Sequence, residues 1–441
     1  MAARTLGRAM LLTTVLAMGA ALTIGAAPAQ RGFVYVLEVE GVIDPPVASY
    51  IERGIAKAEK DGAQALIIRL NTPGGLDKSM RDITQAELNA NVPVVVYVAP
   101  VGARAASAGA IITLACHIAA MAPSTNIGAA HPVAMGGGEM TKEMSKKVEN
   151  DAAATARGIA ARRGRNAKWA EDAVRQSISS TAQEALKLHV IEIIAEDQHD
   201  LLKQLDGRKV KLPGRTVTLR TADAKARELP PSPIERFLHI LSDPNLSYIF
   251  LIIGIYGIIF ELQNPGAIFP GVVGAICLIM GFYSLAVLPV NFAGLILILL
   301  GVGMLVADIW APSHGALTVG GVIAFAVGSF MLYGSRATPF LRVSWLIVVM
   351  MTVLTAAFFL FIVGLGVRAH WTRVTTGVEG LVGARGKART ALHPEGSVFV
   401  AGELWRARAE GDQPIEAGQE VEVVGVDGLT LRVRRRESSA L

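Results

Sequence analysis

Two turns of the sequence carry residue types that could catalyse acyl transfer. Residues 71–76 read Asn-Thr-Pro-Gly-Gly-Leu, and residues 102–110 read Gly-Ala-Arg-Ala-Ala-Ser-Ala-Gly-Ala. A Gly-Gly pair before a helix lets backbone N–H groups point at a developing anion, as an oxyanion hole requires. Ser107 lies at the head of the next expected helix among small residues, where a nucleophile would be exposed. Both turns also have structural interpretations, because Pro-Gly-Gly is a good turn and serine often caps a helix.

The segments around these turns alternate between strands and helices. The pattern predicts strands at 34–43, 65–70, 92–99 and 118–122, and helices at 46–60, 77–90, 106–115 and 143–163. This alternation is typical of a parallel sheet covered on both faces, in which the chemistry lies beyond the carboxyl ends of the strands. Further along the chain, residues 208–221 alternate as a hairpin. The Arg-Arg-Gly-Arg run at 162–165 predicts a helix end with solvated charges.

The N-terminus has the pattern of a secretion signal. Arg4 and Arg8 precede an apolar run at 9–24, and residues 27–29 read Ala-Pro-Ala, a small-residue cleavage site. We therefore expect a signal peptide at 1–29 and an exported domain at 30–235, outside the cell or in the periplasm. An uncleaved anchor helix is the alternative, although the apolar run is short for a bilayer.

The composition indicates a membrane protein with soluble domains on either side of the membrane segment. Of 441 residues, 52% are apolar and 18% are charged, and the mean hydropathy is +0.44. Residues 246–370 contain only five charges, which are Glu261, Asp308, Arg336, Arg342 and Arg368. Five apolar segments divide this transmembrane domain, at about 246–260, 268–288, 292–306, 317–333 and 345–367. Some are short for a full span, so either four or five crossings are consistent with the sequence, and we favour five.

Residues 376–437 change to alternating polar and apolar residues with glycine-rich turns. Several short strands in so few residues favour a small closed barrel. The net charge of +5 contains no basic stripe, which argues against nucleic-acid binding. Cys116 and Cys277 are far apart and suggest neither a disulfide framework nor a metal site, and no cofactor motif is evident.

Several stretches together resemble the long form of the NfeD family, membrane-bound ClpP-class serine proteases related to signal peptide peptidase A. They are the two turns above, Asn-Ile-Gly-Ala-Ala-His-Pro-Val at 126–133, Lys-Val-Glu-Asn-Asp-Ala at 147–152, and Gly-Glu-Leu-Trp at 402–405. The resemblance extends from about residue 34 to 435. It implies an α/β ClpP/crotonase-like protease domain, an α-helical multi-pass membrane domain and an all-β OB-fold C-terminal domain.

The resemblance also implies a Ser–Lys dyad. Ser107 matches the nucleophile, Lys147 matches the general base, and the N–H groups of Gly75 and Ala108 would form the oxyanion hole. A lysine accepts a proton at neutral pH only if burial or nearby positive charge lowers its pKa. On a helical wheel of 143–163, Lys147 lies at the edge of the expected inward stripe, while Lys146 points away from it. That stripe consists of Met144, Val148, Ala152, Thr155 and Ile159.

His131 is the alternative base. It lies 24 residues after Ser107, much like the serine-to-histidine spacing in ClpP, and histidine needs no large pKa shift. The NfeD resemblance instead gives this position a structural role, so Lys147 is preferred. The glycine- and methionine-containing residues 134–140 could form a mobile lid over an apolar groove or a plain loop.

The sequence therefore predicts a membrane-anchored serine endopeptidase. The resemblance implies that it cleaves apolar segments of membrane-associated proteins, with stomatin-like proteins as substrates or partners. We expect a homodimer or a larger homo-oligomer that needs no cofactor or metal and binds no nucleic acid. Two alternatives remain, a non-proteolytic scaffold for a stomatin-type membrane assembly and a crotonase-type acyl-transfer enzyme. Export and the lack of an evident coenzyme A site disfavour the second.

Overall fold

The computed structural model describes residues 32–133, 141–288, 290–311, 313, 315–333, 342–371, 378–411 and 413–436. The expected signal peptide at 1–29 and the expected lid at 134–140 lie outside these residues. The chain divides into two compact units, Met1–Leu305 with His314–Leu354, and Val306–Ser313 with Thr355–Leu441.

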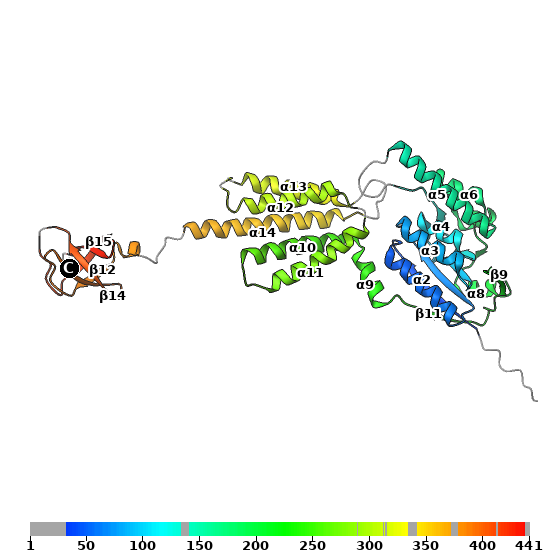
Figure 1. Cartoon of the computed structure of the whole chain (residues 1–441), viewed down its shortest axis with the longest axis horizontal. Helices are drawn as coiled ribbons and strands as arrows, with labels where there is room; N and C mark the ends of the chain where they lie inside the picture. The colour runs from blue at the N-terminus through cyan, green and yellow to red at the C-terminus, as the bar shows by residue number, and fades with distance from the viewer. Residues whose placement is uncertain are drawn as a thin grey trace, which may run out of the picture. The chain divides into compact units, whose positions relative to one another are not determined.

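A six-stranded sheet organises the N-terminal part of the chain (Figure 1). Every neighbouring pair in it is parallel. In spatial order its strands are β11 (Lys225–Glu228), β1 (Phe33–Glu40), β2 (Ala65–Asn71), β3 (Val94–Val98), β5 (Ile118–Met121) and β8 (Ile193–Ile194). The central strands are apolar and buried because both faces of the sheet are covered.

The larger of the two cores lies between the sheet and a layer of helices. These are α2 (Pro45–Lys60), α3 (Asp77–Asn89), α4 (Ala108–Ala115), α5 (Lys142–Arg163), α6 (Ala167–Arg175) and α7 (Ala182–Lys187). A smaller core on the other face involves α8 (Gln198–Leu205) and the hairpin of β9 (Lys209–Leu212) and β10 (Arg215–Thr218). The expected alternation of strands and helices is confirmed, as is the hairpin.

A second, three-stranded sheet corrects one sequence expectation. Its strands are β4 (Arg104–Ala106), β6 (Asn126–Gly128) and β7 (Ser179–Thr181). The helix expected to begin at 106 begins at Ala108, because Ala105 and Ala106 pair with β6 instead. The strand β4 therefore delivers Ser107 directly to the start of α4.

Five apolar helices follow, in the positions of the five expected segments. They are α10 (Pro244–Gln263), α11 (Phe269–Val287), α12 (Phe292–Ala307), α13 (Ala316–Leu332) and α14 (Trp345–Trp371). By length and composition α10 and α11 could each cross a membrane, and the other three contain shorter apolar runs. Gly257 and Gly274 bring α10 and α11 into backbone contact, and Gly301 and Gly321 do the same for α12 and α13. A short amphipathic helix, α9 (Pro233–Leu241), precedes α10.

The C-terminal strands close into a barrel, as expected. Its order is β12 (Arg385–Ala388), β13 (Glu395–Val400), β14 (Glu403–Ala409), β16 (Thr430–Arg435) and β15 (Glu420–Asp427). Alternate residues of these strands, among them Val398, Val423 and Leu431, fill its interior.

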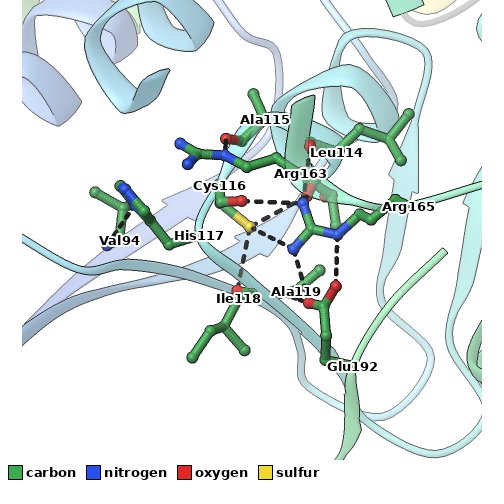
Figure 2. Close-up of polar contacts among 11 residues, drawn as sticks. Val94, Leu114, Ala115, Cys116, His117, Ile118, Ala119, Arg163, Arg165 and Glu192 are labelled. Atoms are coloured by element: carbon green, nitrogen blue, oxygen red, sulfur yellow. Dashed lines mark hydrogen bonds and ion pairs between the residues drawn. The ribbon is translucent and has the colours of Figure 1, made fainter. Parts of the chain in front are cut away.

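A buried arginine fixes the far end of α4 (Figure 2). The Nη1 of Arg165 donates to the carbonyls of Thr113, Leu114 and Cys116, where α4 ends. Its Nε and Nη2 donate to the Glu192 carboxylate at 2.8 and 2.7 Å. The helix end expected near 162–165 is confirmed, since α5 ends before a left-handed Gly164. The expectation of solvated charges there is wrong for Arg165, because its guanidinium is buried and hydrogen-bonded to the end of α4.

Replacing Arg165 by methionine should destabilise the domain by about 3 kcal/mol, because the carbonyls at the end of α4 lose the guanidinium and the Glu192 carboxylate is left with the Ala119 N–H as its partner. The measurement is unfolding of the purified chain in denaturant. Arg162→Met, an exposed arginine in the same turn, is the matched control and should change stability by less than about 0.5 kcal/mol. Equal effects of the two substitutions would contradict the capping role of Arg165.

Candidate active site

Ser107 lies in the turn between β4 and α4 with an unusual backbone conformation. Its φ of 53° and ψ of −118° are strained for any residue with a side chain. Its backbone N–H donates to the Gly128 carbonyl at 3.0 Å, which anchors the turn. The side chain makes no capping hydrogen bond to α4, so the interpretation of Ser107 as a helix cap is wrong. Its hydroxyl instead lines a cavity of about 200 Å³.

The Gly-Gly turn of the sequence lies against Ser107. The Ile43 N–H donates to the Gly74 carbonyl, and the Leu76 N–H donates to the Ile43 carbonyl, each at 2.9 Å. Ile43 and Gly75 thus form a parallel bridge, in which Ile43 bonds to Gly74 and Leu76, the two neighbours of Gly75. The N–H of Gly75 therefore faces away from Ile43. Gly75 lines the same cavity as Ser107.

Both positions require glycine, because neighbouring atoms lie too close for a side chain. A Cβ on Gly74 would lie 2.6 Å from the Cβ of Ser107, and the φ of Gly74 is +123°. A Cβ on Gly75 would lie 2.2 Å from the Ile43 carbonyl oxygen. The first residue of α4, Ala108, also lines the cavity, and the N–H of a first helical residue has no partner within the helix. The structure thus brings Ser107, Gly75 and Ala108 to one cavity.

His131 lies at the same cavity. Its Nδ1 is 2.9 Å from the Val174 carbonyl oxygen, so Nδ1 carries a proton and donates there. The other ring nitrogen, Nε2, is left able to accept a proton when the ring is neutral.

Lys147 is exposed on the N-terminal half of α5 and does not line the cavity. Within the described residues its amine makes no hydrogen bond to Ser107. The expected inward stripe holds only in part: Val148, Ala152 and Thr155 line the cavity and Ile159 is buried, but Met144 is 51% exposed. The buried residues of α5 begin only at Ala153, so its first turns lie outside the core and Met144 is exposed. Lys146, the neighbour expected to point away, is exposed as well.

Several cavity residues were not anticipated from the sequence. Asp77, Met80 and Arg81 line it from α3, and Ile111 and Val174 line it from α4 and α6. Arg81 bridges the helices of the rim by pairing with Asp77 at 2.8 Å and with Asp151 of α5 at 2.7 Å. The amphipathic start of α3, directly after the glycine turn, is the sequence signal that could have indicated these residues.

Most of the cavity wall is apolar. In the described ranges no three His, Cys, Asp or Glu side chains gather closely enough to hold a metal ion. Both cysteines are unpaired and buried. Burial raises the pKa of the Cys116 thiol to about 12, so it is not a nucleophile at neutral pH. The cavity thus brings together a serine, a histidine and the glycine turn.

Three family descriptions match successive parts of the chain. They are the NfeD1b N-terminal domain over residues 33–212, the NfeD integral membrane domain over 245–364, and the NfeD-like C-terminal, partner-binding domain over 378–435. Together with the parallel sheet, the apolar helices and the closed barrel, they confirm the expected fold classes of the three parts.

Known proteins match over nearly the whole length. The membrane-bound protease PH1510 of Pyrococcus horikoshii is 38% identical over 415 residues, 92% of this chain and 94% of that protein. Membrane protein NfeD1b of Bacillus subtilis is 28% identical over 442 residues, with the same coverage of each chain. The solved 1510-N membrane-bound stomatin-specific protease, a lysine-to-alanine mutant in complex with a substrate peptide, is 38% identical. It covers 48% of this chain and 98% of its own, with a TM-score of 0.44. The chain belongs to the NfeD family.

Proposed function

We propose that this chain is a membrane-anchored serine endopeptidase. The observation that carries the proposal is the strained turn that presents Ser107 to an apolar cavity, which Gly75 and Ala108 also line. The 38% sequence identity to a membrane-bound protease, over 92% of this chain, supports the proposal. The scaffold alternative gives no reason for the strain at Ser107 or for the cavity.

The reaction would proceed through an acyl-enzyme. The Ser107 hydroxyl oxygen attacks the carbonyl carbon of the scissile peptide and passes its proton to the base. The N–H groups of Gly75 and Ala108 stabilise the oxyanion of the tetrahedral intermediate. As this intermediate collapses, the base returns the proton to the leaving amine, and an ester remains on Ser107. A water molecule, deprotonated by the same base, then hydrolyses the ester.

We assign the base to Lys147, with His131 as the alternative. Lys147 directly precedes Val148, the first residue of α5 that lines the cavity. A substrate strand laid between α3 and α5 would cover the first turns of α5 and exclude water from the amine, which favours the neutral base. A related protease was solved with a substrate peptide as a lysine-to-alanine mutant, which also supports a lysine. His131 competes because it already lies at the cavity, but its Nδ1 bond to Val174 also suits a structural role.

The cavity favours an apolar side chain next to the scissile bond. Met80, Ile111, Val148 and Val174 contribute to its wall, and Arg81 and Asp77 are already paired with each other. The related 1510-N protease is described as stomatin-specific. We therefore propose that this chain cleaves an apolar segment of a stomatin-like membrane protein, with the C-terminal barrel as a partner-contacting domain. We propose a homodimer or a larger homo-oligomer as the assembly, and 30–235, 246–370 and 376–437 as the domain bounds.

The proposal is tested by peptide cleavage. The full chain, purified in detergent, should hydrolyse a peptide with apolar residues on both sides of the scissile bond. A peptide of the same length in which aspartates replace the apolar residues should be cut at least about tenfold more slowly, because the cavity offers them no partner. No cleavage of either peptide under conditions where the chain is folded would favour the scaffold alternative.

We propose that the protease domain lies outside the cytoplasm and that five crossings place the barrel inside. A cysteine introduced as Glu410→Cys, on the exposed surface of the barrel, should then react with an impermeant maleimide only after intact cells are permeabilised. The native cysteines are buried and give little background. Lys187→Cys, exposed on the protease domain, is the control and should react without permeabilisation. Labelling of Glu410→Cys on intact cells would favour four crossings.

A further inference from the structure

The connection between β1 and α2 makes hydrogen bonds to the turn at 71–76, which contains Gly75 of the proposed oxyanion hole. The Gly41 N–H donates to the Asn71 carbonyl at 3.0 Å, and Ile43 makes its two backbone bonds to Gly74 and Leu76. Residues 41–43 therefore bond to both ends of the turn that contains Gly75. Because Gly75 itself makes none of these bonds, the direction of its N–H depends on where Ile43 lies.

Asp44 fixes the position of Ile43. Its side chain is 2% exposed and caps α2, since Oδ1 accepts the Val47 N–H at 2.9 Å. Its second oxygen, Oδ2, lies 2.7 Å from Nδ1 of His239, which belongs to α9. A carboxylate oxygen can only accept, so Nδ1 carries a proton and donates to Asp44, and this hydrogen bond raises the pKa of His239. A carboxylate buried to this degree would be costly without its second partner.

Other contacts hold α9 against the α/β domain without His239. Arg53 of α2 forms two hydrogen bonds to the Glu235 carboxylate, at 2.8 and 2.7 Å. The Tyr50 hydroxyl donates to the Leu229 carbonyl just before α9. At the other end of α9, the Ser284 hydroxyl of α11 donates to the Leu241 carbonyl at 2.6 Å. Docking of α9 therefore does not need His239, and its bond to Asp44 is available for another role.

We infer that His239 is a positioning residue for the proposed protease: through Asp44 and the backbone of Ile43, it holds the Gly75 N–H towards the oxyanion. The inference rests on the proposed function. It also connects the active site to the membrane part of the chain, since α9 leads directly into α10 and is bonded to α11. Loss of the imidazole leaves Asp44 with one partner, and the Gly75 turn loses the support that fixes its direction.

The experiment compares three variants of the full chain in detergent, with the apolar peptide as substrate. His239→Leu keeps apolar volume but has no donor. His239→Asn places an amide nitrogen close to the position of Nδ1, so it can still donate to Asp44. His199→Ala, an exposed histidine on α8, is the surface control. The values of kcat and KM are measured separately, and each variant's Tm is measured beside them.

We expect His239→Leu to lower kcat about tenfold with KM within about twofold, because a misdirected N–H weakens transition-state binding only. His239→Asn should keep kcat within about threefold of the parent, and His199→Ala should be unchanged. The inference is overturned if His239→Leu keeps the parental kcat, if the loss is in KM, or if His239→Asn loses as much as His239→Leu. It is also overturned if the variants lose kcat in proportion to their loss in Tm, since destabilisation would then account for the effect. Failure of the proposed function looks different, because Ser107→Ala would then cleave as fast as the parent.

Discussion

The Ser107→Ala variant should lose at least about three orders of magnitude in kcat while binding the peptide as before. Removing the nucleophile of a serine-type protease leaves only the residual catalysis provided by the oxyanion hole and by binding. The measurement is the rate of peptide cleavage by the full chain under single-turnover conditions, with binding followed by fluorescence anisotropy. The hydroxyl of Ser107 makes no capping bond, so its loss should not destabilise the fold.

Ser124→Ala is the matched control for this substitution. Ser124 is also a serine with positive φ, at 58°, but it is exposed in a turn away from the cavity. This variant should cleave at the parental rate. If Ser107→Ala cut as fast as Ser124→Ala, the serine would have no role as nucleophile, and the scaffold alternative would replace the enzyme.

The second large effect concerns the base. Lys147→Ala should abolish measurable cleavage, because it removes the group that we assign to take the proton of Ser107. Lys147→Arg should be equally inactive, since a guanidinium stays protonated at any working pH. The measurement is kcat/KM as a function of pH, in which the lysine mechanism predicts a rate that continues to rise above the range where histidine titrates.

Two controls separate Lys147 from its competitors. Lys146→Ala removes the adjacent, equally exposed amine and should be nearly neutral. His131→Ala removes the bond to the Val174 carbonyl and should weaken the enzyme while leaving measurable turnover. An inactive His131→Ala together with an active Lys147→Ala would transfer the role of base to His131.

The parts of the site that depend on local backbone could be predicted from the sequence. The Gly-Gly turn and the small residues around Ser107 are local signals, because only glycine tolerates the approach of Ile43 and Ser107. Most of the strands and helices around them follow from periodicity, although β4, which leads into Ser107, was not expected. The charge-poor segment likewise indicated the five apolar helices, and the alternating C-terminal residues indicated the barrel.

The parts that depend on tertiary pairing could not be predicted. The strand β11 is exposed and highly charged, and only its pairing with β1 makes it a strand. Arg165 appeared to be a solvated charge because nothing in the sequence near it indicates the end of α4 or Glu192. The position of Lys147 was inferred from a helical wheel, which describes the faces of α5 but not which of its turns reach the core.

The strain at Ser107 has a consequence for how such chains diverge. A residue with a side chain at φ 53° and ψ −118° costs the fold on the order of 1–3 kcal/mol, and glycine would relieve most of it. Selection for stability alone therefore favours glycine at this position, and only selection for cleavage retains serine. Once a lineage no longer needs the reaction, mutational drift should replace the serine early and leave the membrane helices and the barrel intact. A descendant with glycine at this position would be a more stable, non-catalytic membrane protein derived from an enzyme.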